Sequence, residues 1–436
     1  MAEQTFRTLM RTTDVIVTAL FSPAAVVAIG LADLYARFPL RIGLGLGGGA
    51  IALSSQDTGS GATANRDEAI TQALLMGVLT GVPFALFGVF FGEWAISILG
   101  ASERVARLGG QYLALIFATA PARHVALIGA RSLQGTGDTR TPMYINVFAN
   151  ALNISGTVVL GLGLFGFPEL RVVGVGVSTA AANVVTAALL LLAMWTPWSE
   201  ASFARPRDLV IARQLVEVSL PRIAEGFVAT LAEFPFNSLL LGFGTAVNAG
   251  FQIGRRMYQQ VTGPLSRGYS VAASVVVGQA LGDADPERAR FEGWAVAALG
   301  VVTVGVVGLL LVLGAGWFVR LFSDDPETVR YATNFARVYG LSGCVLVVFV
   351  ALSGALQGAS ETRTPFVART TGMLGFFLGF SWLVGETLGY GPLGAYLGIG
   401  LSYLWMALVV GWSFRRSDWA SRAARMMAER GSATEG

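Results

Sequence analysis

The sequence is poor in charged, thiol and imidazole side chains, and each shortage excludes a class of protein. Only 13% of the 436 residues are charged, against about 25% in soluble domains, so the chain cannot cover itself with a solvated surface. A single cysteine (Cys344) and a single histidine (His124) exclude a disulfide framework and a His/Cys metal cluster. No lysine is present, and the net charge of +3 is too small and too dispersed to indicate nucleic-acid binding.

The sequence patterns of catalysis and of nucleotide hydrolysis are also absent. The chain has no HExxH motif, no pair of aspartates within an apolar run, no Cys/His pair and no Walker loop. A membrane-embedded enzyme would need a nucleophile with a base, or a metal cluster. We therefore expect no enzyme activity, no cofactor and no direct use of ATP.

Long apolar runs dominate what is present. Hydrophobic residues make up 54% of the chain, and the mean hydropathy is +0.62. A transmembrane helix needs about 20 mostly apolar residues, and an open strand would leave backbone groups unsatisfied in lipid. The sequence therefore predicts an all-α polytopic membrane protein with twelve transmembrane helices. The predicted spans lie near residues 8–31, 32–56, 70–99, 108–134, 142–165, 170–195, 215–242, 246–280, 292–322, 331–357, 366–388 and 391–414.

One polar motif occurs twice, each time between the fourth and fifth spans of one half. The segment LQGTGDTRTP (residues 133–142) returns 223 residues later as LQGASETRTP (residues 356–365). The same offset relates SQDTG (residues 55–59) to GQALG (residues 278–282). An even number of spans per half predicts two six-helix bundles in the same orientation, arranged about a central cavity as in parallel-repeat transporters.

The repeated motifs predict the ends of helices. Leu-Gln-Gly ends one helix and Thr-x-Thr-Pro begins the next, because threonine can cap a helix and proline suits the first helical position. Arg140 and Arg363 would then lie at the level of the lipid headgroups. The residues to which we assign this structural role are Gln134, Gly135, Arg140, Pro142, Gln357, Gly358, Arg363, Pro365, Gln279 and Gly282.

Composition and arginine distribution predict how the chain is divided and oriented. We expect a six-helix bundle over residues 1–197, a linker over 198–214, a second bundle over 215–414 and a tail over 415–436. Arginines gather in the even-numbered loops and the tail, whereas loops one, seven and eleven have no basic residue and loops three and nine have two each. The positive-inside rule then places both termini, the linker and the tail in the cytoplasm. We expect a monomer in the cell membrane, with small-molecule substrates and the lipid bilayer as its partners.

These segments together resemble the multidrug and toxic compound extrusion (MATE) family. The resemblance rests on the paired LQGxxDTRTP-type segments, on VVVGQALGDADPERAR after the eighth span, and on twelve spans in two halves. SSQDTGSGATANRDEA in the first half is a degraded version of the second-half segment, and the resemblance covers nearly the whole chain. It implies cation-coupled export of organic, often cationic, compounds by alternating access, with Na+ or H+ as the coupling ion.

The resemblance implies a coupling-ion site in the first half. It assigns Asp14, in the first span, to cation binding; the alternative is an interfacial aspartate paired with Arg11. In the fifth span Asn150, Asn153 and Thr157 follow one another at i+3 and i+4 spacing. Archaeal-type members of the family carry an acidic residue where Thr157 stands, so one carboxylate is missing here, which weakens a Na+ assignment.

Further polar residues of the sixth and seventh spans are candidates for the same chemistry. Ser178 and Thr179 would add hydroxyl groups, although small polar residues also form hydrogen bonds between packed helices. In the seventh span Arg222 lies one turn before Glu225, which predicts a structural ion pair. Glu233 has no basic residue within one turn and is a candidate second proton or cation site, with Asn237 one turn on as a cavity residue.

The eighth span contains GRRMYQQ (residues 254–260), an unusual sequence at membrane depth. We expect Arg255 and Arg256 to compensate acidic groups rather than contact substrate, because a permanent guanidinium charge disfavours cationic substrates. Tyr258 and Gln259 are expected to line the substrate cavity, together with Asn150, Ser178 and Asn237. A lone membrane histidine is most often a hydrogen-bonded packing residue, which is how we interpret His124; the alternative is a residue that titrates near neutral pH and carries a proton.

The repeat and the resemblance both place Met1 inside the first span. About eight residues, or about 12 Å of helix, have no counterpart before it.

Taken together, the motifs and the resemblance predict a cation-coupled (Na+ or H+) antiporter for organic, cationic or amphiphilic compounds. The alternatives are a fold-related flippase for lipid-linked or amphiphilic compounds, to which Arg255 and Arg256 give weight, and an inactive, N-terminally truncated transporter.

Overall fold

The computed structural model describes residues 2–434, with side chains described from Leu9 to Gly431. The described residues form helices joined by short loops, and no strand occurs among them. Contacts divide the chain into two compact units: an N-terminal unit (Met1–Ser54, Ala62–Ser219 and Arg430–Gly436) and a C-terminal unit (Ser55–Gly61 and Leu220–Glu429). The expectation about what precedes Met1 lies outside the described residues.

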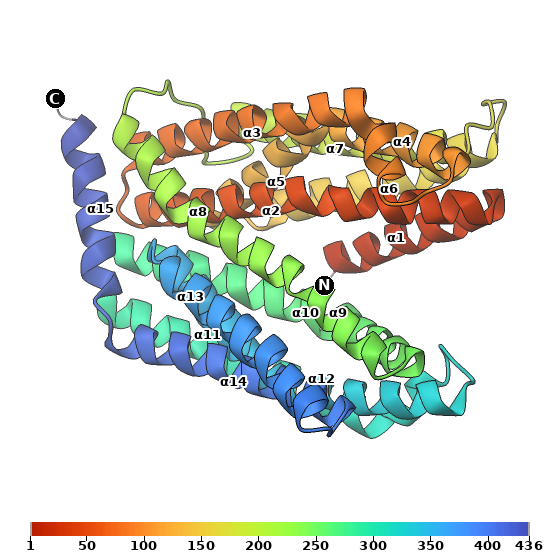
Figure 1. The fold of residues 1–436 in the computed structure, drawn as a ribbon. Helices are drawn as coiled ribbons and strands as arrows, with labels where there is room; N and C mark the ends of the chain where they lie inside the picture. The colour runs from red at the N-terminus through yellow and green to blue at the C-terminus, as the bar shows by residue number, and fades with distance from the viewer. Residues whose placement is uncertain (1, 435–436) are drawn as a thin grey trace. The chain divides into compact units, whose positions relative to one another are not determined.

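The N-terminal unit is built from seven helices that lie mostly side by side (Figure 1). Within it α1 packs on α6, α3 packs on α4 and α5, and α7 packs on α4, α5 and α6. The helices are α1 (Ala2–Phe21), α2 (Pro23–Gly59), α3 (Thr63–Ser97), α4 (Glu103–Ala118), α5 (Ala120–Gly135), α6 (Arg140–Leu162) and α7 (Val172–Trp195).

The C-terminal unit contains the remaining helices, except that α8 up to Ser219 and α15 from Arg430 belong to the N-terminal unit. Within the C-terminal unit α10 packs on both α11 and α12, and α12 packs on α14. The helix that follows α13 is wound as a π-helix in two segments, η1 and η2. The bounds are α8 (Leu209–Leu231), α9 (Glu233–Gly242), α10 (Thr245–Gly282), α11 (Pro286–Val319), α12 (Pro326–Gly358), α13 (Arg363–Thr371), η1 (Gly372–Phe380), η2 (Leu383–Thr387), α14 (Pro392–Arg416) and α15 (Trp419–Thr434).

The predicted class of an all-α polytopic membrane protein is confirmed. Among the described residues, eight helices are individually long and apolar enough to cross a membrane, or nine if α4 and α5, which meet at a bend of 48°, form one broken span. The predicted first, seventh and eighth spans correspond to α1, to α8 with α9, and to α10. These predicted spans contain charged residues, such as Asp14, Glu233 and Arg255.

The boundary between the first two predicted spans was wrong. The prediction divided them near residue 31, whereas α1 ends at Phe21 and α2 begins at Pro23. The Ser22 hydroxyl oxygen accepts a hydrogen bond from the Ala25 backbone N–H at 3.2 Å. A capping serine followed by a proline at the first helical position is a helix-start signal, and the apolar residues on both sides of it obscured the break.

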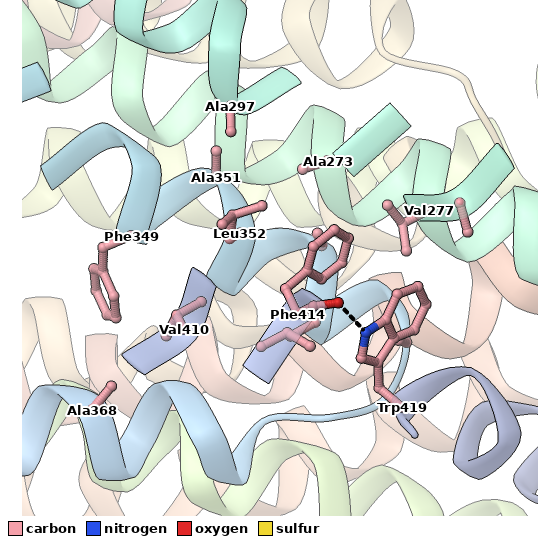
Figure 2. Packing of buried hydrophobic residues seen from close by; sticks show 14 of the residues in the cluster. Ala273, Val277, Ala297, Phe349, Ala351, Leu352, Ala368, Val410, Phe414 and Trp419 are labelled. Atoms are coloured by element: carbon pink, nitrogen blue, oxygen red, sulfur yellow. Dashed lines mark hydrogen bonds between the residues drawn. The ribbon is translucent and has the colours of Figure 1, made fainter. Parts of the chain in front are cut away.

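Small residues allow the helices of the C-terminal unit to approach closely. A Cβ added to Gly354 would lie 2.1 Å from the Ser270 carbonyl oxygen, and one added to Gly358 would lie 2.2 Å from the Ser274 carbonyl oxygen. Ala273, Ala297, Ala351, Val410 and other residues of this core are fully buried (Figure 2). This packing of glycine and alanine is typical of helices that associate within a bilayer.

The C-terminal helix α15 is attached to the same core and runs across the end of α14 (Figure 1). The Trp419 ring stacks on the Phe414 ring with centroids 4.9 Å apart, and its indole Nε1–H donates to the Phe414 carbonyl oxygen at 2.8 Å (Figure 2). Trp419 is 2% exposed. These contacts of Trp419 with Phe414 hold the start of α15 against the end of α14, where the chain turns at Ser417.

The repeated decapeptides do end and begin helices, but not through the predicted cap. Neither Thr139 nor Thr362 makes a side-chain cap hydrogen bond. Instead one carboxylate oxygen of Asp138 accepts from two backbone N–H groups at 3.1 and 3.0 Å, and one of Glu361 accepts from two at 3.1 Å. A carboxylate reaches the exposed N–H groups of the first turn and has the favourable charge there.

The prolines of the motif also differ from the prediction. Helices α6 and α13 begin at Arg140 and Arg363, so Pro142 and Pro365 occupy the third helical position rather than the first. Proline is tolerated there because the N–H groups of the first turn have no partner within the helix. Both prolines are buried, and both arginines are exposed.

Candidate functional site

Asp14 lies in the N-terminal unit, where α1 packs on α6. One carboxylate oxygen, Oδ1, accepts a hydrogen bond from the Thr157 hydroxyl at 2.9 Å. Thr157 is fully buried and Asp14 is half-buried. The Thr18 hydroxyl donates to the Asp14 main-chain oxygen at 2.5 Å. The structure therefore joins the predicted acidic residue of the first span to the predicted hydroxyl of the fifth.

Asn153, one turn before Thr157 on α6, extends this group toward α7. Its side-chain Nδ2–H donates to the Thr179 hydroxyl oxygen at 3.1 Å. Its Oδ1 atom is buried and has no hydrogen-bond partner among the described residues. A carboxylate, two hydroxyls and an unpaired amide oxygen thus gather where α1, α6 and α7 meet, a set of hard oxygen donors suited to a proton or an alkali cation.

The other two predicted residues of this region are placed less centrally. The Ser178 hydroxyl is buried and donates to the Gly174 carbonyl oxygen of its own helix at 2.8 Å. A Cβ on Gly156 would lie 2.8 Å from the Ser178 Oγ, so Ser178 is packed against α6. Asn150 is half-buried, one turn from Asn153. Their assignment to a substrate cavity stays a prediction.

Charged groups surround the Asp14 carboxylate on α1 and α2. Asp33 is the second acidic group of this region, and Arg11 is the basic group that acts on both carboxylates. Among the described residues no group of three or more His, Cys, Asp and Glu side chains has the geometry to hold a metal ion. A cation bound here would therefore depend on one carboxylate and neutral oxygens.

Glu233 and Asn237 belong to a separate polar cluster in the C-terminal unit, where α9 meets α10. Arg255 donates to Glu233 Oε1 at 2.6 Å. The Asn237 Oδ1 atom accepts from Gln252 at 2.6 Å and from Asn248 at 3.0 Å. The sequence showed no basic residue within one turn of Glu233, and the structure supplies one from the next helix. An ion at Glu233 would have to displace this guanidinium.

Glu225 forms a buried ion-pair cluster with two arginines. Arg222 Nη1 lies 2.5 Å from one carboxylate oxygen and Arg369 Nε lies 2.7 Å from the other. The predicted pairing with Arg222 is confirmed. Arg369, which lies on α13, was missed because a partner 144 positions along the chain leaves no local signal.

Tyr258 and Gln259 point to different sides of α10. The Tyr258 ring stacks on Tyr339 with centroids 5.4 Å apart and is 4% exposed, so it belongs to the core between α10 and α12. Gln259 is exposed. Their predicted role in a substrate cavity stays a prediction, and the structure favours Gln259 over Tyr258 for contact with a ligand.

His124 is a fully buried packing residue, as predicted. Its Nε2 atom lies 2.8 Å from the Pro39 carbonyl oxygen on α2. Its Nδ1 atom lies 3.1 Å from the Gly77 carbonyl oxygen and 3.2 Å from the Thr80 hydroxyl, both on α3. The ring therefore ties α5 to α2 and α3 just after the bend at Thr119.

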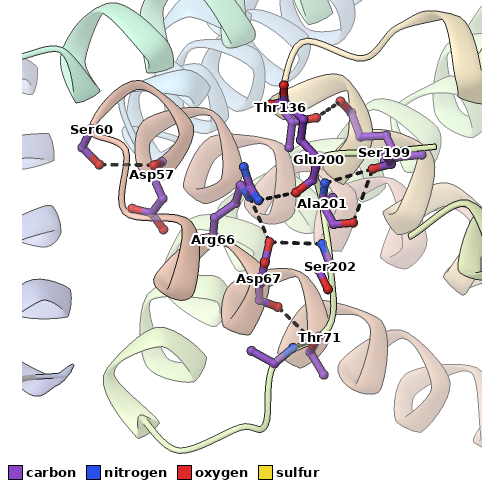
Figure 3. Close-up of polar contacts among 12 residues, drawn as sticks. Asp57, Ser60, Arg66, Asp67, Thr71, Thr136, Ser199, Glu200, Ala201 and Ser202 are labelled. Carbon is purple, nitrogen blue, oxygen red and sulfur yellow. Dashed lines mark hydrogen bonds and ion pairs between the residues drawn. The ribbon is translucent and has the colours of Figure 1, made fainter. Parts of the chain in front are cut away.

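The start of α3 holds the linker between the two halves, a role that the sequence did not reveal. One carboxylate oxygen of Glu68 accepts from the backbone N–H groups of Arg207 and Asp208 at 2.6 and 2.7 Å and thereby caps α8. Beside it, Arg66 donates to the Glu200 carbonyl oxygen and to Asp67 (Figure 3). No local pattern in the segment NRDEA (residues 65–69) indicates this role, because its partners lie about 135 residues away.

The repeated glycines and glutamines lie at helix ends in close contact. A Cβ on Gly282 would lie 2.2 Å from the Gln56 carbonyl oxygen, and one on Gly59 would lie 2.1 Å from that of Gln279. Gln134 accepts from Arg131 at 3.3 Å, and Gln357 is buried. These contacts support the structural role assigned to the motifs.

Comparisons with known proteins agree with this architecture. A family model described as MatE matches residues 1–159 and 221–383. The "Probable multidrug resistance protein NorM" of Rhodopseudomonas palustris is 30% identical over 96% of this chain and 90% of its own length. The NorM protein of Bradyrhizobium diazoefficiens is 29% identical over 92% and 88%. A crystal structure of MATE in the straight conformation superposes with a TM-score of 0.88 at 19% identity, covering 98% of this chain and 94% of that one.

Proposed function

The chain belongs to the MatE family, and from this premise we propose that it is a cation-coupled antiporter that exports organic compounds by alternating access. The relatives named as multidrug resistance proteins support efflux of several compounds rather than of one. We propose cationic or amphiphilic substrates, a location in the cytoplasmic membrane and cytoplasmic termini. The arginine bias of the even-numbered loops supports this orientation.

Asp14 is the proposed coupling-ion residue, and its contact with Thr157 is the observation that carries the proposal. An ionisable group within a membrane span is costly and marks ion or proton pathways. Here the Asp14 carboxylate accepts a hydrogen bond from the buried Thr157 hydroxyl. The unpaired side-chain oxygen of Asn153 lies one turn before Thr157 on α6. Binding a proton or Na+ at Asp14 would change its hydrogen bond to α6 and so bias the packing of α1 on α6.

Transport into and out of proteoliposomes tests this function. Purified protein is reconstituted with internal ethidium, and Na+ and H+ gradients are imposed separately while ethidium efflux is followed by fluorescence. We expect efflux under at least one gradient, and the gradient that drives it identifies the ion. Efflux that proceeds equally without any gradient would replace the antiporter by a flippase-type facilitator, and no efflux under either would refute the proposal.

A pair of variants tests the assigned residue. Asp14→Asn keeps the shape of the side chain but removes the titratable charge, so we expect loss of gradient-driven efflux. Asp138→Asn is the matched control, because Asp138 caps α6 outside the Asp14 group and asparagine is an equally good cap. Unimpaired efflux by Asp14→Asn would remove Asp14 from the coupling site.

A further inference from the structure

One face of α10 is polar over about six turns, although this helix corresponds to a predicted membrane span. At about 100° per residue, its polar residues fall within an arc of about 140°. Most are exposed and the rest are half-buried. They are Asn248, Gln252, Arg255, Arg256, Gln259, Gln260 and Arg267, and we call them the α10 polar face.

The opposite face of α10 is fixed against α12. A Cβ added to Gly250 would lie 2.7 Å from the Tyr331 Cβ, and one added to Gly254 would lie 2.7 Å from the Phe335 Cβ. Phe251, between them, is 1% exposed and packs edge-on against Phe335. Because the backbones approach so closely here, α10 cannot rotate to turn its polar face inward.

The neighbouring helix α11 shows what a lipid-facing surface looks like in this chain. Leu309, Leu310 and Leu313 are 56%, 61% and 74% exposed on α11. A helix in contact with lipid presents such apolar residues, whereas arginines within spans almost always face a bundle interior or a water-filled cavity. The α10 polar face is therefore not a lipid contact, and it lies along water or a ligand.

The α10 polar face has an uncompensated positive charge. Arg255 is matched by Glu233 at 2.6 Å. Arg256, the next residue, is exposed and makes no hydrogen bond or ion pair with any residue that the structure describes. The sequence-based expectation that both arginines compensate acidic groups thus holds for Arg255 and lacks support for Arg256. Gln259 lies one turn from both and offers an amide donor.

We propose that the α10 polar face binds a negatively charged group of the exported compound. Arg256 supplies the charge, and Gln252 and Gln259 supply amide donors. A planar guanidinium binds carboxylate, phosphate or sulfonate groups through charge-assisted hydrogen bonds. This inference rests on the proposed export function and extends its substrate class: besides cations, the exported compounds include amphiphiles that carry an anionic group.

Thiol labelling tests the electrostatic claim directly, because Cys344 is the only cysteine. In a Cys344→Ser background, Gln259→Cys is treated with an anionic methanethiosulfonate (ethylsulfonate) and a cationic one (ethyltrimethylammonium). We expect the ratio of anionic to cationic reaction rates to fall at least about threefold when Arg256→Gln is added, and to be retained with Arg256→Lys. An unchanged ratio, or no reaction with either reagent, would overturn the proposal.

Two control cysteines guard against a general effect. Ser323→Cys, in the loop between α11 and α12, should give a ratio that Arg256→Gln does not change. Leu310→Cys, on the apolar face of α11, should react with neither reagent. If Arg256→Gln shifts the ratio at Ser323→Cys equally, the effect is not local to the α10 polar face and the proposal fails.

Protection by ligands separates an exported anion from a lipid headgroup. We expect 1-naphthoate to slow labelling of Gln259→Cys more than the neutral 1-naphthamide does, and this preference to disappear with Arg256→Gln. Protection by phosphatidylglycerol nanodiscs with no preference for naphthoate would assign the site to lipid instead. None of these measurements requires transport, so a failed efflux assay with an intact labelling ratio would reject the antiporter and leave the anion site standing.

Discussion

The two units share a repeat in sequence, yet they carry different charges at equivalent positions. With the offset of 223, Asp14 of the N-terminal unit corresponds to Asn237 of the C-terminal unit, and Asp33 corresponds to Arg256. The helix ends, by contrast, are repeated closely, since α5 and α12 both end at the glycine of the motif. The repeat has kept the backbone architecture while the charges at membrane depth diverged, which assigns different chemistry to the two units.

Moving the carboxylate from one unit to the other is expected to have the largest effect. Asp14→Asn combined with Asn237→Asp keeps the number of carboxylates and exchanges their units. We expect gradient-driven efflux to stay reduced about tenfold or more, equivalent to about 1.4 kcal/mol, because position 237 lies among amides and one turn from the Glu233–Arg255 pair. Efflux assays in proteoliposomes check this. Recovery of coupled transport by the exchange would show that the two units are chemically equivalent.

The ion-pair cluster at Glu225 belongs to the C-terminal unit, and the repeat position of Glu225 in the other half is Ala2, which has no carboxylate. Glu225→Gln leaves two guanidinium groups, Arg222 and Arg369, without their shared carboxylate. Breaking a buried pair by removing one partner costs about 3–5 kcal/mol, so we expect a large loss of stability, measured as a lower Tm or as a lower denaturant midpoint in detergent. Restoration by combining Glu225→Gln with Arg369→Gln would confirm the cause, and an unchanged Tm in the single variant would contradict it.

The motif glycines allow a closer comparison between the units. A Cβ at Gly358 would lie 2.2 Å from the Ser274 main-chain oxygen, whereas one at Gly135 would lie 1.9 Å from the Ser54 hydroxyl. Overpacking costs about 1–3 kcal/mol, and a hydroxyl can rotate away while a helix backbone cannot. We therefore expect Gly358→Ala to lower the Tm more than Gly135→Ala. Equal shifts would mean that Ser54 is as rigid as the backbone, and Gly135→Ala with Ser54→Ala tests that directly.

The sequence predicted those features that are encoded locally. Apolar run length located the helices, and the glycines of the motif located the ends of α5 and α12. The family resemblance placed Asp14 and Thr157 in one group of candidate ion-binding residues, but it did not predict the hydrogen bond between them. Partners far along the chain were missed, such as Arg369 for Glu225 and the backbone N–H groups of Arg207 and Asp208 for Glu68. A charged residue within an apolar segment indicates that a partner is needed. The identity of that partner depends on how the helices pack, which the local sequence does not show.

The smallest predicted difference concerns the two helix caps, where Asp138 and Glu361 occupy equivalent positions. Asp138→Ala removes a cap of α6 and should cost about 1 kcal/mol. Glu361→Ala removes the same cap from α13 and also a 2.6 Å ion pair between Glu361 Oε2 and Arg422 of α15. A hydrogen bond to a charged group contributes about 1.5–3 kcal/mol, so the second variant should lower the Tm further. Adding Arg422→Gln to each variant isolates the difference: it should destabilise Asp138→Ala, which still has the ion pair with Glu361, more than Glu361→Ala, which lacks it. If Arg422→Gln costs the same in both backgrounds, the ion pair does not hold α15 and the two caps are equivalent after all.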